Sequence, residues 1–432
     1  MPASDNRPLI VTNARLVDPA SGRDATGALL VRNGVIEDLS AEANPAAPDG
    51  AEVVNAGGNV LAPGLVDMRA FIGEPGFEHR ENIASASLAA AAGGVTSVVC
   101  TPETEPAIDD PALVDFLMRR ANDDSLVRIY PAAALTKGLQ GQEMAEIGLL
   151  KAAGAVAFTD GAHTVTKANV FARALTYARD FGALVMHHTE DPTMSGGAMN
   201  AGEFASRLGL SGRSTEAETI VVERDVRLAR MTRGRYHAAI LTCQNSLDVI
   251  RRAKDEGLAV TCGTSINHLS FNETDIGDYR TFFKLAPPLR TEDERLNLVE
   301  ALSQGLIDVV VSDHTPQDAE QKRQPFSEAA HGAIGLETML VAGLRLVHAG
   351  QIALPALLRA MSTRPAELLG IAGGRLEKGA PADLILFDPE EPWVLDRELL
   401  KSRSKNTPFD EARLQGRVLR TLVGGRTVHR AA

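Results

Sequence analysis

The middle of this 432-residue chain repeats one pattern eight times: a short apolar segment is followed by a polar segment with helical spacing. Short apolar runs bounded by turn residues are typical of buried strands, and their alternation with helices favours a parallel sheet. Eight strands of this kind predict an α/β fold, a TIM-like (β/α)8 barrel. The expected strands are Leu61–Met68, Ser97–Cys100, Val127–Pro131, Ala155–Phe158, Leu184–His188, His237–Leu241, Ala259–Cys262 and Asp308–Ser312.

Two of the intervening segments also carry a helix start signal. Thr215 with Glu218, and Thr291 with Glu294, have the Thr-x-x-Glu spacing of a capping box, so a helix is predicted to begin at each threonine. Residues 263–290 do not fit the alternation and are read as a long insertion.

Both ends of the chain have a different pattern of apolar and polar residues from the middle. Short alternating segments broken by Asn-Gly and Gly-Gly turns occupy residues 1–60 and return in residues 376–432. These two ends are therefore predicted to form one small composite β-sandwich, and residues 61–375 the barrel.

Charge and composition exclude several classes of function. The chain has 44 basic and 56 acidic residues, for a net charge of −12, which argues against a nucleic-acid partner. It has no run of 18 apolar residues, and its start, "MPASDNRPLI", lacks the pattern of a signal peptide, so a cytoplasmic protein without a membrane partner is expected. The cysteines at 100, 243 and 262 are too widely spaced for a thiolate zinc site or a disulfide framework.

Catalytic groups of a TIM barrel lie at the carboxyl ends of its strands. His188 is either a structural histidine of the rim or a metal ligand, and the residues alone leave both interpretations open. His237 begins its strand, at the wrong end for chemistry, and is interpreted as structural. An acid at the mouth of an apolar strand normally meets a cation or hydrogen-bond donors. The polar residues at these strand ends include Arg69, Glu74, Thr101, Glu103, Asp160, His187, His188, Glu190, Asp191, Asp313 and His314.

From about residue 8 to residue 430 the chain resembles the dihydroorotase branch of the amidohydrolase superfamily. The motifs that carry the resemblance occur in the family's order: "LAPGLVDMRAFIGEPG", "AAAAGGVTSVVCTPETEPAID", "HHTED", "APPLRTEDER", "SDHTPQDAEQKRQPFSEA", "GAIGLETML", "TRPAELLGI" and "GRLEKGAPADLILFD". Such a resemblance implies a barrel with a small β-domain, hydrolysis of a cyclic amide, and zinc that activates a bound water.

The family's metal ligands are only partly present in this sequence. The resemblance implies that His188 keeps the strand-five histidine, that Asp313 keeps the strand-eight aspartate, which is the family's general base, and that Asp160 lies near the strand-four acid. The three other histidine positions are replaced, by Arg69, Phe71 and Ile240.

The family's substrate-binding positions are altered as well. Gly73 stands where the family has an arginine that binds the substrate carboxylate, and Glu103 and Ala286 each stand where it has an asparagine. Of that set only His314 is kept. Glu103 would also place a negative charge opposite an anionic substrate.

Charge distinguishes an active metal site from one that no longer binds a metal. An arginine about 4 Å from a dication would repel it by about 8 kcal/mol at an effective dielectric constant of about 20. The leading hypothesis is therefore a non-catalytic dihydroorotase-like protein of pyrimidine biosynthesis, without a cofactor, that forms oligomers and assembles with aspartate carbamoyltransferase, a partner implied by the resemblance alone. The alternative is an active zinc-dependent cyclic amidohydrolase that uses His188 and Asp313. A third hypothesis is a small-molecule binding module that uses the pocket where the family has its active site.

The replaced residues also predict a local structure. Arg69 is expected to pair with Asp313 near the place of the metals, and Phe71 and Ile240 to fill the remaining volume. Removing Arg69 would then leave a buried carboxylate without a partner and cost about 3–5 kcal/mol.

Overall fold

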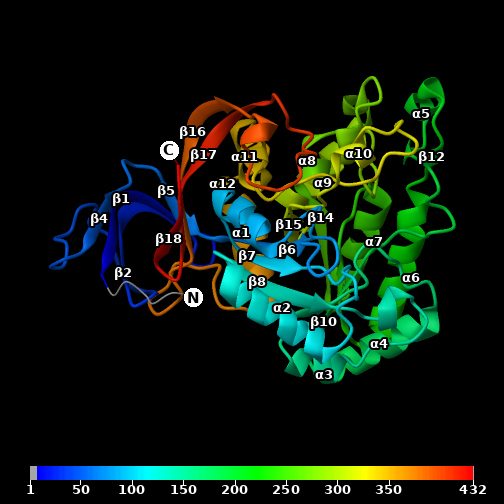
Figure 1. Cartoon of the computed structure of the whole chain (residues 1–432), viewed down its shortest axis with the longest axis horizontal. Helices are drawn as coiled ribbons and strands as arrows, with labels where there is room; N and C mark the ends of the chain where they lie inside the picture. The colour runs from blue at the N-terminus through cyan, green and yellow to red at the C-terminus, as the bar shows by residue number, and fades with distance from the viewer. Residues whose placement is uncertain (1–6, 432) are drawn as a thin grey trace.

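The computed structural model describes residues 7–431 and contains two eight-stranded sheets (Figure 1). The sheet of the middle region is parallel throughout, and its strands follow one another in the chain order from β6 to β15. The predicted (β/α)8 barrel is confirmed. Its strands are β6 (Leu65–Ala70), β7 (Val95–Cys100), β8 (Arg128–Ala133), β9 (Ala157–Phe158), β10 (Leu184–His187), β13 (Arg235–Ala238), β14 (Val260–Ser265) and β15 (Val309–Val311).

Side-chain and backbone contacts bring the first and last strands of this sheet together. Asp67 of β6 is buried and accepts hydrogen bonds from the Ser312 amide, at 3.2 Å, and from the Ser312 hydroxyl. An isolated bridge also joins Ala70 to His314. The ends of β6 and β15 are therefore neighbours, although they are far apart in the chain.

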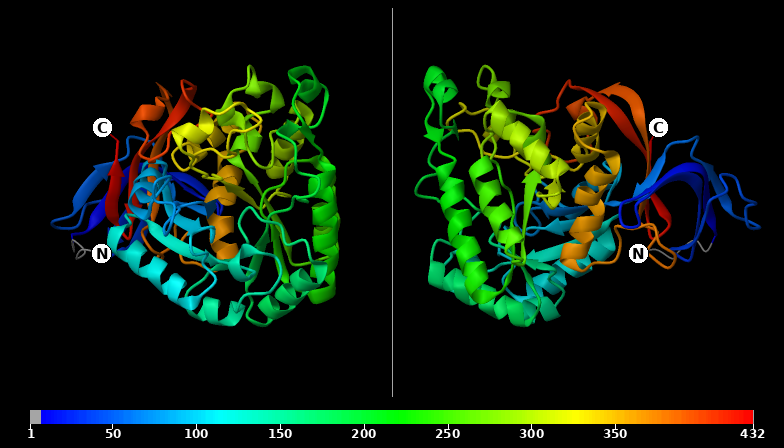
Figure 2. Two further views of the ribbon diagram at one scale, coloured as in Figure 1. Left: turned by 45° about the vertical axis from the view of Figure 1, so that its right-hand side comes forward. Right: turned by 180° about the vertical axis from the view of Figure 1, so that it is seen from behind.

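Helices surround the barrel sheet, as the two views of Figure 2 show. The helices that lie between consecutive barrel strands include α1 (Ile83–Ala92), α2 (Pro111–Asp124), α3 (Ile147–Ala152), α4 (Ala168–Asp180), α6 (Glu216–Thr232), α7 (Gln244–Asp255) and α9 (Glu292–Ser303). The helices after β15 are α10 (Ala319–Lys322), α11 (Met339–His348), α12 (Leu354–Leu358), η4 (Arg359–Thr363) and α13 (Arg364–Leu369).

Short elements occupy the loops on the barrel. They are η1 (Lys137–Leu139), β11 (Met199–Asn200), α5 (Glu203–Leu208), β12 (Gly212–Arg213), α8 (Ile266–Ser270), η2 (Glu273–Ile276), η3 (Thr281–Phe283) and η5 (Arg397–Leu399).

Strands from both ends of the chain form the second sheet. β5 of the N-terminal part pairs with β16 of the C-terminal part, in the order β18-β17-β16-β5-β1-β2-β3, and β4 pairs with β1. One composite β-domain from both ends was predicted, and the strands of the two ends do share this sheet. Its strands are β1 (Leu9–Asp18), β2 (Arg23–Arg32), β3 (Val35–Ser40), β4 (Glu52–Asn55), β5 (Val60–Pro63), β16 (Leu384–Val394), β17 (Arg413–Val423) and β18 (Arg426–Arg430).

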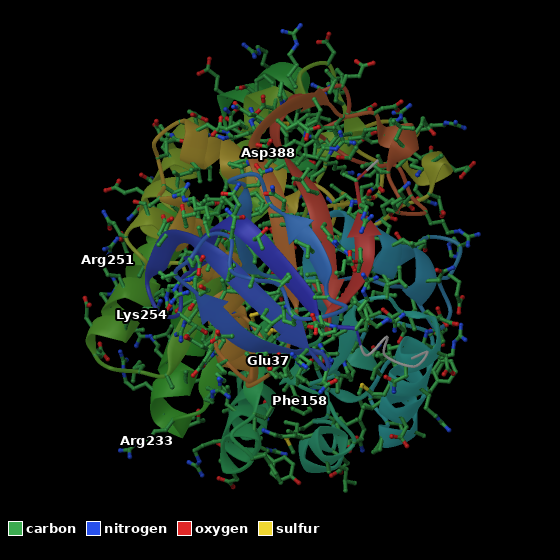
Figure 3. All side chains as sticks on the ribbon, turned by 90° about the vertical axis from the view of Figure 1, so that its left-hand side faces the viewer. Glu37, Phe158, Arg233, Arg251, Lys254 and Asp388 are labelled. Carbon is green, nitrogen blue, oxygen red and sulfur yellow. The ribbon has the colours of Figure 1, made fainter. Side chains whose placement is uncertain are left out.

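Apolar side chains fill the barrel and separate it from solvent. Met68, Met186 and Val311 belong to one buried cluster inside the barrel sheet, and a larger cluster lies between the strands and the outer helices. By contrast, Arg233 and Arg251 are exposed and lie at the edge of the molecule when it is viewed onto the terminal sheet (Figure 3). The barrel thus contains a buried apolar cluster below its carboxyl-end loops.

Strand one differs from its prediction. The apolar run Leu61–Met68 is divided at Gly64: its first part is in β5, in the terminal sheet, and its second part is in β6, in the barrel. A Cβ atom at Gly64 would lie 2.1 Å from the Thr96 hydroxyl, so only glycine fits where the chain passes between the sheets. The terminal sheet accordingly extends to Pro63, three residues beyond the predicted boundary.

Strand six also lies earlier than predicted, at Arg235–Ala238. Residues 239–241 are as buried and apolar as the strand before them, which is why the sequence pattern extended the strand too far. The strand in turn places His237 within the barrel wall, where its Nδ1 lies 2.9 Å from the Thr261 hydroxyl and burial lowers its pKa to about 4.

Neither predicted capping box forms in full. The Thr215 side chain caps nothing, and Glu218 instead accepts hydrogen bonds from the Thr242 amide. Thr291 does cap its helix through the Glu294 amide, but the Glu294 carboxylate accepts from Gln244. Each glutamate carboxylate accepts a hydrogen bond from a backbone amide of another segment instead of capping its own helix.

The segment 263–290 is only partly an insertion. Its first three residues complete β14, and α8, η2 and η3 follow. No helix within residues 7–431 has the length and apolar character needed to cross a bilayer. Residues 1–6, which contain most of the start that was judged not to be a signal peptide, lie outside the described residues.

Candidate functional site

Arg69 and Asp313 meet at the carboxyl ends of the first and last barrel strands. Arg69 Nε donates to Asp313 Oδ1 at 3.0 Å, and Arg69 Nη1 donates to the Gly161 carbonyl at 3.1 Å. The predicted pair is confirmed, with a single hydrogen bond from the guanidinium to the carboxylate. The guanidinium divides its donors between strand eight and the loop after strand four.

The Asp313 carboxylate lies in a poorly solvated place. Burial raises its pKa, although the positive charge and hydrogen bond of Arg69 lower it and His188 lowers it further. The residue has a φ of 51°, in the left-handed region, which turns its side chain away from the line of β15. Arg69 is therefore the main group that stabilises the charged form of Asp313.

Asp160 is held by the loop that follows β8. Its Oδ1 accepts from the Leu135 and Thr136 amides, each at 2.9 Å, and its Oδ2 accepts from the Thr136 hydroxyl. Burial raises the pKa of this carboxyl, and the hydrogen bonds oppose that rise. Both oxygens are thus engaged in fixing the loop.

His188 lies at the end of strand five beside a buried carboxylate. Its Nε2 is 3.6 Å from Glu190 Oε2, which also accepts from Arg213 Nη1 at 2.8 Å. Burial raises the pKa of Glu190, but His188 and Arg213 outweigh it and the net shift is downward. The Nδ1 atom of His188 is buried and has no partner within the described residues. His188 is therefore the one predicted ligand with an unused ring nitrogen.

The neighbouring His187 belongs to a separate network in the barrel wall. Its Nδ1 lies 2.6 Å from Asp225 Oδ2, and its Nε2 accepts from the Val165 amide at 2.9 Å. Tyr236 and Arg224 donate to the same aspartate. Asp191, further along the motif, accepts from Thr193 near the surface. The four ionisable residues of "HHTED" do not form one site.

Phe71 and Ile240 are both buried, in different places. Ile240 belongs to the apolar cluster inside the barrel, and Phe71 packs in the loop after β6. A cavity of about 570 Å3 remains above them, lined in part by Arg69, Phe71 and Asp313. Phe71 lines this cavity and Ile240 does not, so the expectation that these two side chains fill the site is wrong.

A second cavity, of about 800 Å3, adjoins the first and is lined in part by His188, Glu190 and Arg213. Thr104, Leu139, Ala162, His163 and Ala286 line both cavities. The mouth of the barrel is consequently a broad recess, with the Arg69–Asp313 contact on one side and His188 on the other.

Of the replaced substrate positions, Glu103 and Ala286 line this recess, and Gly73 lies in the loop after β6. Gly73 has a φ of 74°, and a Cβ atom there would lie 2.8 Å from the Phe77 carbonyl and 2.9 Å from the Glu81 carbonyl. The Glu103 Oε1 atom accepts from the Ala162 amide at 2.9 Å. Ala286 contributes only a methyl group to the lining.

His314 is enclosed beside the barrel rather than facing the recess. Its Nδ1 accepts from the Gly335 amide at 3.2 Å, which leaves Nε2 to donate to Glu81 Oε2 at 3.3 Å. Glu81 also accepts from Ser85 and Ser402. Both ring nitrogens thus have protein partners, and the substrate-binding role implied by the resemblance stays a prediction.

Arg80 is a residue of the recess that the sequence patterns did not identify. Its guanidinium carbon lies 4.1 Å from the centre of the Phe71 ring, and its Nε donates to the Pro316 carbonyl at 2.9 Å. The residue lies in an irregular loop, where no periodicity marks it. An arginine ten residues beyond the end of β6 is the only signal the sequence offers.

These contacts do not fit a zinc ion. Three ligands and an open position are the usual requirement of a catalytic site, and an ion beside Asp313 would have to displace the Arg69 guanidinium. Both oxygens of Asp160 are already occupied. Within residues 7–431 no three His, Cys, Asp or Glu side chains lie in an arrangement that could hold a metal. What the site offers chemically is a set of fixed charges around a recess.

The sequence matches known proteins along almost its whole length. A family model described as dihydro-orotase-like matches residues 58–246. A protein from Geobacter metallireducens named dihydroorotase is 39% identical, covering 98% of this chain and 99% of that protein. A dihydroorotase from Anaplasma phagocytophilum is 41% identical, covering 97% and 94%.

Solved structures agree on the architecture. The L-hydantoinase of Arthrobacter aurescens superposes with a TM-score of 0.89 at 25% identity, over 98% of this chain and 96% of the enzyme. A dihydropyrimidinase from Brevibacillus agri reaches 0.85 at 21% identity, over 98% and 95%, and supports the fold alone. With relatives of about 40% identity that span both its barrel and its terminal sheet, the chain belongs to the dihydroorotase-like family.

Proposed function

We propose that this protein is a non-catalytic member of its family and acts in pyrimidine biosynthesis as an assembly partner of aspartate carbamoyltransferase. The observation that carries the non-catalytic half is the hydrogen bond between Arg69 and Asp313. The carboxylate that the resemblance assigns to the general base is occupied by a permanent cation, which does not deprotonate in proteins.

The substrate side supports the same proposal. A carboxylate-binding arginine cannot stand at position 73, because backbone carbonyls already lie within 3 Å of its Cβ position. Glu103 adds a negative charge to the recess that an anionic ring would have to enter. The assembly half of the proposal rests on the family resemblance. The chain keeps the whole fold of the family, although these positions have changed.

The second candidate is an active metal-dependent dihydroorotase that converts dihydroorotate and water to N-carbamoyl-aspartate. It is favoured by the relatives that are named dihydroorotase and are similar over both regions of the chain. It requires a rearranged metal site that includes His188 and Asp313.

Metal analysis and turnover separate the two candidates. We expect elemental analysis of the protein from its native host to find no stoichiometric zinc, and expect no hydrolysis of dihydroorotate with or without added zinc. The Geobacter metallireducens relative, prepared in parallel, controls for the assay. About one tightly bound zinc per chain, with turnover lost in Asp313→Ala, would establish the second candidate.

Assembly is tested in the native cell. Deleting the gene should shift aspartate carbamoyltransferase to a smaller species on size-exclusion chromatography and lower its activity, and the Asp313→Ala protein should restore both. An unchanged elution volume and unchanged activity after deletion would count against the assembly role.

A further inference from the structure

The recess above Arg69 and Asp313 contains two opposite charges that do not touch each other. Arg80 and Glu103 both line the cavity of about 570 Å3. Arg80 forms no ion pair within residues 7–431: its contacts there are the Pro316 carbonyl and the Phe71 and Phe77 rings. Glu103 bonds to a single backbone amide, through Oε1, and has no ion-pair partner in the same part of the chain.

Each of these groups has free hydrogen-bonding atoms. The two Nη atoms of Arg80 and the Oε2 atom of Glu103 have no partner within the described residues, and the Nη2 atom of Arg69 is likewise unused. Burial removes water from Arg80 and lowers its pKa, while the charges of Asp318 and Glu103 raise it. A partly desolvated guanidinium on the face of a ring, without a direct carboxylate contact, is a site for an anionic group.

The local backbone keeps Glu103 in position. A Cβ atom at Gly161 would lie 2.2 Å from Glu103 Oε2, so the absence of a side chain at position 161 makes room for the carboxylate. The same Gly161 offers its carbonyl to Arg69. The negative group is therefore fixed close to the Arg69–Asp313 contact, while Arg80 approaches from the loop after β6.

We propose that this cavity binds a small zwitterion of the α-amino-acid class. Its carboxylate is bound by Arg80 with help from the Nη2 atom of Arg69, and its ammonium group is bound by Glu103. An apolar side chain packs against Phe71 and Phe77, whose ring centres are 6.1 Å apart. The volume lies within the range of small-molecule sites, about 300–1,000 Å3.

This ligand class differs from a simple carboxylate because the cavity has both charges. An anion without a donor would satisfy Arg80 and meet repulsion from Glu103, and a plain amine would do the reverse. A zwitterion satisfies both groups at once. The inference concerns binding alone and does not depend on the assembly role.

Calorimetric titration of the full-length protein tests the proposal with four probes. L-leucine and L-phenylalanine carry both charges, N-acetyl-L-leucine lacks the ammonium group, and L-leucinamide lacks the carboxylate. We expect at least one of the two amino acids to bind, and expect the acetyl and amide derivatives of leucine to bind about tenfold or more weakly than the amino acid that binds, since each loses one charged hydrogen bond.

Two variants assign the charges. Arg80→Gln should abolish binding of the amino acids. Glu103→Gln should weaken amino-acid binding and should give N-acetyl-L-leucine an affinity equal to or greater than that of L-leucine. Arg80→Lys and Glu103→Asp keep the charges and serve if the amide variants do not fold, as judged by circular dichroism. Arg323→Gln, outside this cavity, is the matched control and should bind like the parent protein.

The proposal is overturned if neither amino acid gives heat or a thermal shift at millimolar concentration. It is equally overturned if binding persists unchanged in Arg80→Gln, or if Glu103→Gln does not alter the preference between L-leucine and its acetyl derivative. A zwitterion that binds without any gain of dihydroorotate hydrolysis leaves the proposed function intact.

Discussion

Two buried polar clusters at the end of the barrel sheet use similar residues in opposite ways. In the barrel wall, His187, Asp225 and Tyr236 satisfy one another, and the last ring nitrogen of His187 takes a backbone amide. At the mouth, Arg69 makes one bond to Asp313 and lies beside an open cavity. The wall cluster is closed, and the mouth cluster is incomplete.

This difference separates structural from functional roles. A closed cluster contributes to stability because removing any member leaves the others buried without partners. An incomplete cluster beside a cavity can exchange its lost bonds for water or a ligand. Mutations should therefore cost more stability in the wall than at the mouth, even though both places contain buried acids.

The largest effect is expected from Asp225→Asn in the wall. The amide would present donors to Arg224 or His187, which already donate, so the free energy of unfolding should fall by about 3–5 kcal/mol. Urea denaturation measures it, and Asp180→Asn, at an exposed carboxylate, is the control. A loss below that of a mouth variant would break the comparison.

The second prediction concerns pH and Asp67, which joins β6 to β15. Burial raises its pKa from 3.8 to about 6, so its protonated form is favoured in the folded state. Its contribution to stability is complete below the unfolded pKa and is lost as pH rises through about 6, a change of about 3 kcal/mol. Comparing unfolding of the parent and Asp67→Asn between about pH 3 and pH 7 isolates this change. A constant difference between the two curves would contradict it.

A smaller effect is expected from Arg69→Met at the mouth. The variant removes the partner of Asp313, but the adjoining cavity admits water and the carboxyl can take up a proton. We expect a loss of about 1–3 kcal/mol at neutral pH, less than the 3–5 kcal/mol expected for a sealed pair, and a smaller loss at pH 5. A loss equal to that of Asp225→Asn would show that the mouth is as closed as the wall.

The smallest effect is expected from Phe71→Leu. The ring lines the cavity and faces the Arg80 guanidinium, so its replacement opens little new buried volume and should cost less than about 1 kcal/mol. Ile240→Ala, in the barrel interior, is the matched comparison and should cost about 2–5 kcal/mol. Thermal or urea unfolding of the two variants ranks them directly.

The barrel could be predicted from the sequence because its strands are buried on both sides and their apolar runs are unmistakable. The Arg69–Asp313 contact was also predictable, since parallel strands end at the same edge and opposite charges in that place attract. Strand limits were less predictable: the division of the first run depends on the close approach of Gly64 to Thr96, which no local pattern records.

The rest of the site depends on loops, and loops have no periodicity. Arg80 reaches the recess from the irregular segment after β6, and Asp160 is held by amides of the loop after β8. The expected closure of the site failed for a related reason: Ile240 packs in the apolar cluster inside the barrel, whereas the open cavity is lined mainly by residues of the loops above it.

The tight turn at Gly73 limits which substitutions this loop can accept. With a φ of 74° and two carbonyl oxygens within 3 Å of the place of a Cβ atom, this turn accepts glycine and rejects the arginine that the family resemblance assigns to it. A Gly73→Arg substitution alone would strain the loop before the new side chain could contact any ligand. We therefore expect a laboratory selection for dihydroorotase activity to recover compensating changes around residues 73–81 before, or together with, any change at position 73.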